Sequence, residues 1–292
     1  MSEKLEINNM KGLILPREKT SHKGSFGRVL IIAGSKKFPG AAALSTLGAL
    51  RSGAGIVELM TSKEVIDRIF PLIPEAIVNP IKVNRKGEMK GLFYKKKLKS
   101  VLEKVSVVVF GPGLGNNKTT RKFLKFLITK YDGTLVIDAD GINALSRNID
   151  ILYKKKCDII LTPHPGEMAR LGKTTAQNIS LSREGIAEVF AKNYKITLVL
   201  KGNGTVVACE NGDVFVNTTG SPALSSGGTG DVLVGMIGSL YAAGATKENA
   251  AKLGVFLHGL SGDLAAAAKG EHSTLPRDII EFIPEAIKTI TE

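Results

Sequence analysis

The sequence has no tryptophan and only two cysteines among its 292 residues. Cys157 and Cys209 lie far apart and lack the CxxC spacing of a zinc site, and two cysteines cannot build a disulfide framework. The pattern favours two buried, reduced thiols that carry no chemistry.

Long apolar runs and linkers are also missing. No run reaches the length of a membrane span, and the N-terminal MSEKLEINNM has no basic start, apolar stretch or small-residue cleavage site. No segment rich in proline, serine or charge divides the chain, and we find no internal repeat. We therefore expect a cytoplasmic protein in which residues 1–292 form a single domain.

Positive charge is in excess, and the formal net charge is +13. A basic field attracts nucleic acids, membrane surfaces and anionic small molecules alike. The basic runs YKKKLK (94–99) and YKKKCD (153–158) lie in separate helix-like segments with few arginines and no interleaved aromatic residues for base stacking. We expect neither a nucleic-acid partner nor a membrane partner.

Apolar runs alternate with segments of helical periodicity through most of the chain. Unbroken Val/Ile/Leu runs are typical of parallel strands that are covered on both faces. The expected strands are 28–34, 56–61, 106–111, 134–140, 157–163 and 196–202, and the expected crossover helices include 40–53, 116–131 and 182–194. The pattern predicts an α/β fold with a central, mostly parallel sheet between two layers of helices.

A different pattern follows this series. In TVVACENGDVFVN (205–217), two short β-rich runs flank Asn211-Gly212, which is the strongest short signal for a hairpin. We expect an antiparallel hairpin at one edge of the sheet, followed by helices within 230–244, 246–270 and 275–292.

Two glycine-rich segments indicate ligand contact, because loops after parallel strands lie where α/β proteins bind ligands. GPGLGNN (111–117) lacks the spacing of a dinucleotide fingerprint, and the asparagine before Lys118 argues against a Walker motif. SSGGTGDVLVG (225–235) is more informative, because its glycines leave amide N–H groups bare at the positive end of a helix. Asp231 then either complements the helix dipole or takes a proton from a hydroxyl that attacks a bound phosphate, and the crowded glycines favour the second role.

Six stretches, in this order, carry a family resemblance: HKGSFGRVLIIAGS, GAAALSTLGALRSGAG, GPGLG, VIDADGINAL, LTPHPGEMARL and SSGGTGDVLVG. From about residue 12 to residue 290, the chain resembles the NAD(P)H-hydrate dehydratase family of the ribokinase-like superfamily. That family usually has GNP shortly before the glycine motif, and this chain has Ser221 in the place of the asparagine.

The resemblance implies a ribokinase-like fold and the repair of the hydrated dinucleotides NADHX and NADPHX. A nucleotide would phosphorylate the ring hydroxyl and the ester would eliminate phosphate, with ADP as the expected donor, ATP as a possible one, and Mg²⁺ as cofactor. Asp231 would be the catalytic base. The anion hole would comprise Gly227, Gly228, Thr229 and Gly230, and the nucleotide would contact Lys201, Gly202, Asn203, Gly204, Thr205 and Gly230.

The resemblance implies further contacts in other stretches. The substrate would contact Ala41, Gly113, Gly115, His164 and Asp231, and Mg²⁺ would be organised through water by Asp138, Asn143 and Glu167. Enzymes of this kind commonly form symmetric assemblies, so we expect a homo-oligomer and guess a tetramer. Because the resemblance begins close to residue 1, no N-terminal epimerase domain is expected, and an epimerase would be a separate chain.

Two other interpretations stay open. A small-molecule kinase of the same superfamily, acting on the hydroxymethyl group of a vitamin precursor, would use the same base and anion hole. A non-catalytic nucleotide sensor is disfavoured by the intact Asp231 beside the intact glycines.

Overall fold

The computed structural model describes residues 2–84, 90 and 96–292, and these form a 10-stranded sheet of order β1-β10-β9-β8-β7-β6-β5-β2-β3-β4. The strands from β4 across to β8 pair in parallel, whereas β8, β9 and β10 pair antiparallel. The strands are β1 Glu3–Leu5, β2 Arg28–Ile32, β3 Ile56–Ser62, β4 Ile77–Ile81, β5 Val107–Phe110, β6 Thr134–Ile137, β7 Asp158–Leu161, β8 Thr197–Leu200, β9 Val206–Ala208 and β10 Val214–Asn217. The expected sheet and hairpin are confirmed.

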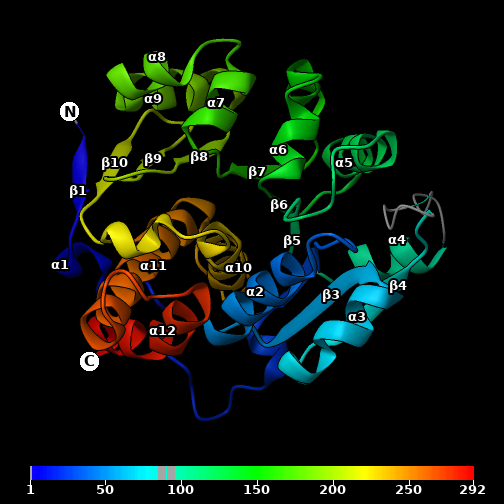
Figure 1. Ribbon diagram of the computed structural model, residues 1–292, viewed down its shortest axis with the longest axis horizontal. Helices are drawn as coiled ribbons and strands as arrows, with labels where there is room; N and C mark the ends of the chain where they lie inside the picture. Colours follow the sequence, from blue (N-terminus) through cyan, green and yellow to red (C-terminus); the bar gives the residue numbers. More distant parts are fainter. Residues whose placement is uncertain (1, 85–89, 91–95) are drawn as a thin grey trace.

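Helices cover both faces of the sheet, as Figure 1 shows. One layer contains α2 (Pro39–Arg51), α3 (Lys63–Ile69), α10 (Thr229–Ala242), α11 (Lys247–Lys269) and α12 (Pro276–Thr291). The other contains α4 (Lys96–Leu102), α5 (Lys118–Lys130), α6 (Asp140–Leu145), α7 (Pro165–Leu171), α8 (Ala176–Leu181) and α9 (Arg183–Tyr194). The short elements are α1 Ile7–Met10 and the 3-10 helices η1 Lys23–Phe26, η2 Phe70–Leu72, η3 Ile149–Lys154 and η4 Pro222–Ser225.

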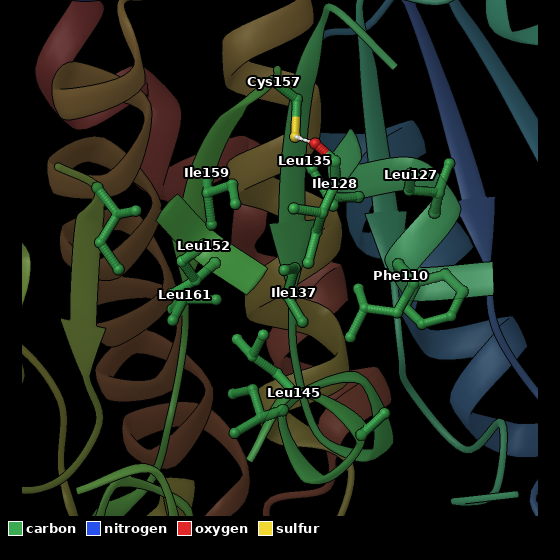
Figure 2. Packing of buried hydrophobic residues seen from close by; sticks show 14 of the residues in the cluster. Phe110, Leu127, Ile128, Leu135, Ile137, Leu145, Leu152, Cys157, Ile159 and Leu161 are labelled. Atoms are coloured by element: carbon green, nitrogen blue, oxygen red, sulfur yellow. Dashed lines mark hydrogen bonds between the residues drawn. The ribbon is translucent and has the colours of Figure 1, made fainter. Parts of the chain in front are cut away.

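The central strands are apolar on both faces because successive side chains point into opposite layers. On β2, Val29 and Ile31 pack in the α2–α10 layer, whereas Leu30 and Ile32 pack in the layer of α5 and α6. Figure 2 shows the second layer, where residues of β5, β6 and β7 meet residues of α5 and α6. This packing explains the unbroken apolar runs of the sequence.

Both cysteines are buried and unbridged, as expected. Burial raises the pKa of Cys157 and of Cys209 to about 12, so both remain thiols at neutral pH. The Cys157 thiol donates a weak hydrogen bond to the Ile128 carbonyl oxygen over 3.7 Å (Figure 2).

Close helix packing fixes the position of α10. A Cβ at Gly235 would lie 2.1 Å from the Ser45 carbonyl oxygen of α2, and one at Gly48 would lie 2.6 Å from the Val232 carbonyl oxygen of α10. The two helices therefore touch backbone to backbone, which holds the N-terminus of α10 at the carboxyl edge of the sheet.

Several expectations need correction. The strand expected over 134–140 ends at Ile137, because the chain turns at Ala139 and α6 begins at Asp140. Strands β1 and β4 were not predicted; β4 is an edge strand that contains Pro80, and proline weakens a strand signal. Strand β1 extends the sheet beyond the confirmed hairpin, because β1 pairs in parallel with β10.

The two basic runs lie at different elements of the fold. Residues 94 and 95 lie outside the described part of the chain, and residues 96–99 open α4. The second run, expected in a helix-like segment, lies at the end of η3 and in the connection to β7. No described helix is long and apolar enough to cross a membrane.

Candidate active site

The carboxyl ends of three neighbouring strands bring three polar side chains together. Asp138 follows β6, Thr162 follows β7 and Lys201 follows β8. The Asp138 carboxylate, only 2% exposed, accepts hydrogen bonds from Lys201 Nζ and Thr162 Oγ1, each over 2.7 Å. A buried carboxylate is costly unless it is paired, and the ion pair with Lys201 offsets part of this cost.

A strained turn follows Asp138. Ala139 has φ +48°, a conformation that costs an ordinary residue about 1–3 kcal/mol. The GPGLG loop presses against this turn, because a Cβ at Gly111 would lie 1.9 Å from the Asp138 carbonyl oxygen. The Gly115 N–H donates to Asp140 Oδ2 over 2.7 Å. Asp140 therefore holds the loop in place.

The N-terminus of α10 has the unpaired donors that an anion site needs. Gly228 is the N-cap residue, with φ +103°, and a Cβ there would lie 2.6 Å from Leu44 Cδ1. No described residue accepts a hydrogen bond from the amide N–H groups of residues 227–230. These groups and the positive end of a 14-residue helix favour a bound anion.

Asp231 lies in the first turn of α10. Burial, aided by the negative charge of Asp138 and opposed by Lys201, raises the pKa of Asp231 to about 7. The helix dipole alone would lower the pKa of a carboxylate at this position, so burial outweighs the dipole at Asp231. A pKa near 7 suits a general base at neutral pH.

Lys201 lies between the two aspartates. Burial alone lowers the pKa of Lys201, but the carboxylates of Asp138, Glu167 and Asp231 together raise it above its ordinary value. The ammonium group also faces α10, because a Cβ at Gly230 would lie 3.4 Å from Lys201 Nζ. Lys201 therefore presents a permanent positive charge beside the unpaired amides.

A cavity of about 450 Å³ adjoins Lys201, within the size range of small-molecule sites. Its wall includes all five residues of the predicted nucleotide segment, 201–205, together with Thr229 and Gly230. Gly227, Gly228 and Asp231 do not line it. The structure therefore divides the predicted site into a cavity and a charged cluster that meet at Lys201 and Gly230.

Sequence reasoning missed two residues of α11. His258 lines the cavity, is 7% exposed, and has no hydrogen-bond partner for Nε2 among the described residues. Burial lowers the pKa of His258 to about 4, so the ring is neutral. Asp263 accepts the Gly220 N–H over 2.8 Å and so fixes the loop of residues 218–226 that forms one cavity wall. The available signal was that His258 and Asp263 are the ionisable residues in the otherwise largely apolar stretch between Lys252 and Lys269.

His164 caps α7. Its Nδ1 accepts hydrogen bonds from the N–H groups of Gly166 and Glu167, over 3.0 and 3.3 Å. Burial, with the charges of Lys201 and Arg170, lowers the pKa of His164, so the ring is neutral with its proton on Nε2. Its side chain is 51% exposed, and Nε2 lies 3.5 Å from Glu167 Oε1.

The remaining predicted residues are two substrate contacts, Ala41 and Gly113, and the proposed metal residues. Ala41 and Gly113 are neighbours, because a Cβ at Gly113 would lie 2.9 Å from Ala41 Cβ. The proposed metal residues do not form a cage, and no group of three or more metal-binding side chains occurs in the described ranges. Asn143 Oδ1 accepts from Arg170 Nε over 2.9 Å, and Glu167 Oε2 accepts from the His164 N–H over 2.9 Å.

The oxygens of Asn143 and Glu167 are thus engaged within the protein, and Asp138 is paired with Lys201. Mg²⁺ commonly keeps several waters and binds through phosphates and one or two carboxylates. The residues present fit a Mg²⁺ ion that is carried on nucleotide phosphates and held through water, and they do not fit a directly ligated ion.

The sheet order and the helix-capped edge define a ribokinase-like fold. Hydroxyethylthiazole kinase from Pyrococcus horikoshii shares it, with a TM-score of 0.55 and 16% identity over 86% of this chain and 94% of the kinase, a likeness that shows the fold alone. The family model described as NAD(P)H-hydrate dehydratase matches residues 29–285. The chain belongs to that family, and the resemblance seen in the sequence is confirmed.

Individual relatives agree. The bifunctional NAD(P)H-hydrate repair enzyme Nnr of Moorella thermoacetica is 36% identical over 276 residues, 94% of this chain and 52% of that protein, so the chain spans about half of its length. The ADP-dependent (S)-NAD(P)H-hydrate dehydratase of Bacillus subtilis is 34% identical over 281 residues, 96% of each chain. The crystal structure of the ADP/ATP-dependent dehydratase from Bacillus subtilis, co-crystallized with ATP and Mg²⁺, has a TM-score of 0.85 and 30% identity over 99% of both chains.

Proposed function

We propose that this protein dehydrates (6S)-NADHX and NADPHX to NADH and NADPH at the expense of a nucleotide. The observation that carries the proposal is Asp231, whose pKa is raised to about 7, in the first turn of a helix with unpaired amides whose residues Thr229 and Gly230 line a cavity of about 450 Å³. Family membership, shown by the match over residues 29–285, selects the substrate.

The reaction has two steps. The ring hydroxyl loses its proton to Asp231, its oxygen bonds to the terminal phosphorus of ADP, and the phosphoanhydride bond breaks to release AMP. The carbon–oxygen bond of the ester then breaks as the ring nitrogen donates electrons, phosphate leaves, and a neighbouring ring carbon loses a proton. The products are the reduced dinucleotide, AMP and phosphate, so the oxygen of the hydroxyl leaves in phosphate.

Each part of the site has a role in this scheme. The amides of Gly227, Gly228, Thr229 and Gly230 bind the transferred phosphoryl group, and Lys201 adds a positive charge. Bound Mg²⁺ would neutralise phosphate charge, with Asp138, Asn143 and Glu167 holding its waters. The segment 201–205 and Gly230 bind the nucleotide.

On the substrate side, the ring of the hydrated dinucleotide lies near Ala41, Gly113, Gly115 and His164. The glycines allow close approach, and the neutral His164 offers an N–H donor at Nε2. Any side chain at Gly113 would clash with Phe38 and Ala41, whereas a Cβ at Gly115 would meet nothing within 4 Å.

We infer ADP as the donor, with ATP as the second candidate, because the relatives from Bacillus subtilis are named as ADP-dependent and as ADP/ATP-dependent. We also infer a homo-oligomer, with a tetramer as the expected form, which light scattering of the purified protein tests.

Absorbance at 340 nm tests the function. Acid-hydrated NADH is mixed with the protein, Mg²⁺ and either ADP or ATP. A rise that depends on the nucleotide is expected and identifies the donor. A flat trace with both donors from folded protein contradicts the proposal, and a stable phosphate ester on a hydroxymethyl substrate supports the vitamin-kinase alternative.

A further inference from the structure

A second pocket, of about 270 Å³, lies between α5 on one side and α6 with η3 on the other. Figure 1 shows α5 and α6 side by side in one helix layer. Five cationic side chains line the pocket and no acidic side chain does. We call it the basic groove, and its cations are Lys118, Arg121, Lys122, Lys125 and Arg147.

Without a bound ligand, the cations of the basic groove repel one another. Four of its cations lie three or four residues apart on one face of α5, where like charges at this spacing repel each other. Lys118 and Arg121 lie in or next to the first turn, where the helix dipole favours acidic residues, and that turn contains none. No ion pair involves any of the five cations in the described ranges. A bound anion would remove this repulsion.

Hydrogen bonds connect the basic groove to the candidate active site. Arg121 Nη1 donates to the side-chain and backbone oxygens of Asn116, over 3.2 and 3.3 Å. Asn116 Nδ2 donates to the Asn143 carbonyl oxygen over 3.3 Å, and Arg170 Nε donates to Asn143 Oδ1 over 2.9 Å. Arg170 is close enough to His164 to contribute to the lowering of its pKa. A polar line with a cation at each end therefore runs along the carboxyl edge.

We propose that the basic groove binds the phosphate-bearing adenosine end of the dinucleotide and favours NADPHX, which carries an additional 2′-phosphate, over NADHX. This inference rests on the proposed function. The reacting ring lies near Gly113, Gly115 and His164 in that proposal, and the basic groove begins directly beyond Asn116. Cationic side chains suit phosphate, and the aliphatic parts of Leu124, Ile128 and Leu145 line the pocket beneath them.

Two matched double variants test the inference. Lys122→Gln/Lys125→Gln removes two exposed charges inside the basic groove. Lys104→Gln/Lys130→Gln removes two exposed charges outside it and serves as the control, because the net charge changes equally. The ratio of kcat/KM for NADPHX to that for NADHX is measured at saturating ADP. Binding of adenosine 2′,5′-bisphosphate is measured by calorimetry, also with ADP saturating.

For the groove variant, we expect kcat/KM for NADPHX to fall about five- to tenfold and that for NADHX to fall much less, since each exposed charge contact contributes modestly. Binding of the bisphosphate should weaken by a similar factor, and the control variant should change neither quantity. Equal losses with both substrates, no loss at all, or equal losses in both double variants would overturn the inference.

The experiment distinguishes a failure of the proposed function from a failure of this inference. Wild-type protein that repairs neither hydrate but binds the bisphosphate through Lys122 and Lys125 would contradict the proposed function and retain the phosphate site. A groove that binds duplex nucleic acid through Lys122 and Lys125 and does not bind the bisphosphate would overturn the inference.

Discussion

The two sides of Lys201 are built in different ways. The wall of the proposed nucleotide cavity contains mainly glycines, hydroxyl groups and apolar side chains. The loop of residues 218–226 in this wall is held by hydrogen bonds to neutral groups and by one carboxylate, that of Asp263. The cluster on the other side concentrates the carboxylates of Asp138, Glu167 and Asp231 around one ammonium group, and burial raises the pKa of Glu167 and of Asp231.

The cavity and the cluster therefore contribute in different ways, the cavity through its shape and the cluster through its charge. A cavity made of backbone and small side chains can select a nucleotide by fit, and it needs little charge of its own. A cluster of buried carboxylates holds at least one of them near neutral pKa, which creates a base at the cost of local electrostatic strain. Changes in the cluster should therefore affect turnover, and changes in the cavity wall should affect nucleotide affinity.

The largest effect is expected from Asp231→Asn. The amide keeps the shape of the side chain but cannot accept the hydroxyl proton, so kcat should fall by about 10³-fold. Isothermal calorimetry should show ADP binding within about twofold of wild type, since Asp231 does not line the cavity. Turnover that survives the substitution would remove Asp231 from the mechanism.

Lys201→Met comes next. Removal of the ammonium group leaves Asp138 buried without its charge partner, so the free energy of unfolding should fall by about 2–4 kcal/mol. The double variant Lys201→Met/Asp138→Asn should recover most of this loss in urea denaturation but no activity. A double variant as unstable as the single one would show that the ion pair is not the cause.

Asp263→Ala should act on the cavity and not on the cluster. Loss of the acceptor for the Gly220 N–H loosens the loop of residues 218–226, so KM for the nucleotide should rise by about tenfold with kcat changed little. Asp263→Asn keeps an acceptor oxygen and is the matched control. A fall in kcat with unchanged KM would contradict the division between cavity and cluster.

The smallest effect concerns pH. Because the basic form of Asp231 is required and its pKa is raised to about 7, kcat/KM should rise with pH and level off above about 7. The negative charge of Asp138 contributes to the raised pKa of Asp231, so Asp138→Asn should move this limb to lower pH by about one unit. The pH range over which kcat/KM rises is compared between wild type and Asp138→Asn. An unchanged range would assign the rise to a group other than Asp231.

The sequence predicted the parts of the site that depend on local pattern. The glycines before α10, the hairpin at Asn211-Gly212 and the apolar parallel strands each follow from neighbouring residues. The nucleotide segment 201–205 and Gly230 were assigned from family resemblance, and the structure places both in one cavity wall.

Contacts between distant segments could not be predicted from the sequence. Nothing in the chain indicates that Lys201 pairs with Asp138 or that Asp263 reaches Gly220, since 63 and 43 residues separate the partners. Burial of His258 and the raised pKa of Asp231 likewise depend on packing between elements. The strand β4 was missed because it is an edge strand interrupted by Pro80.

The most direct measurement follows the oxygen atom of the ring hydroxyl. NADHX prepared in H₂¹⁸O carries the label at that position, and phosphorus NMR of the reaction with ADP and Mg²⁺ detects ¹⁸O by its isotope shift. We predict one ¹⁸O atom in each inorganic phosphate formed, with AMP and NADH in equal amounts. Unlabelled phosphate would show that the hydroxyl never attacks phosphorus, and would contradict the assignment of Asp231 as its base.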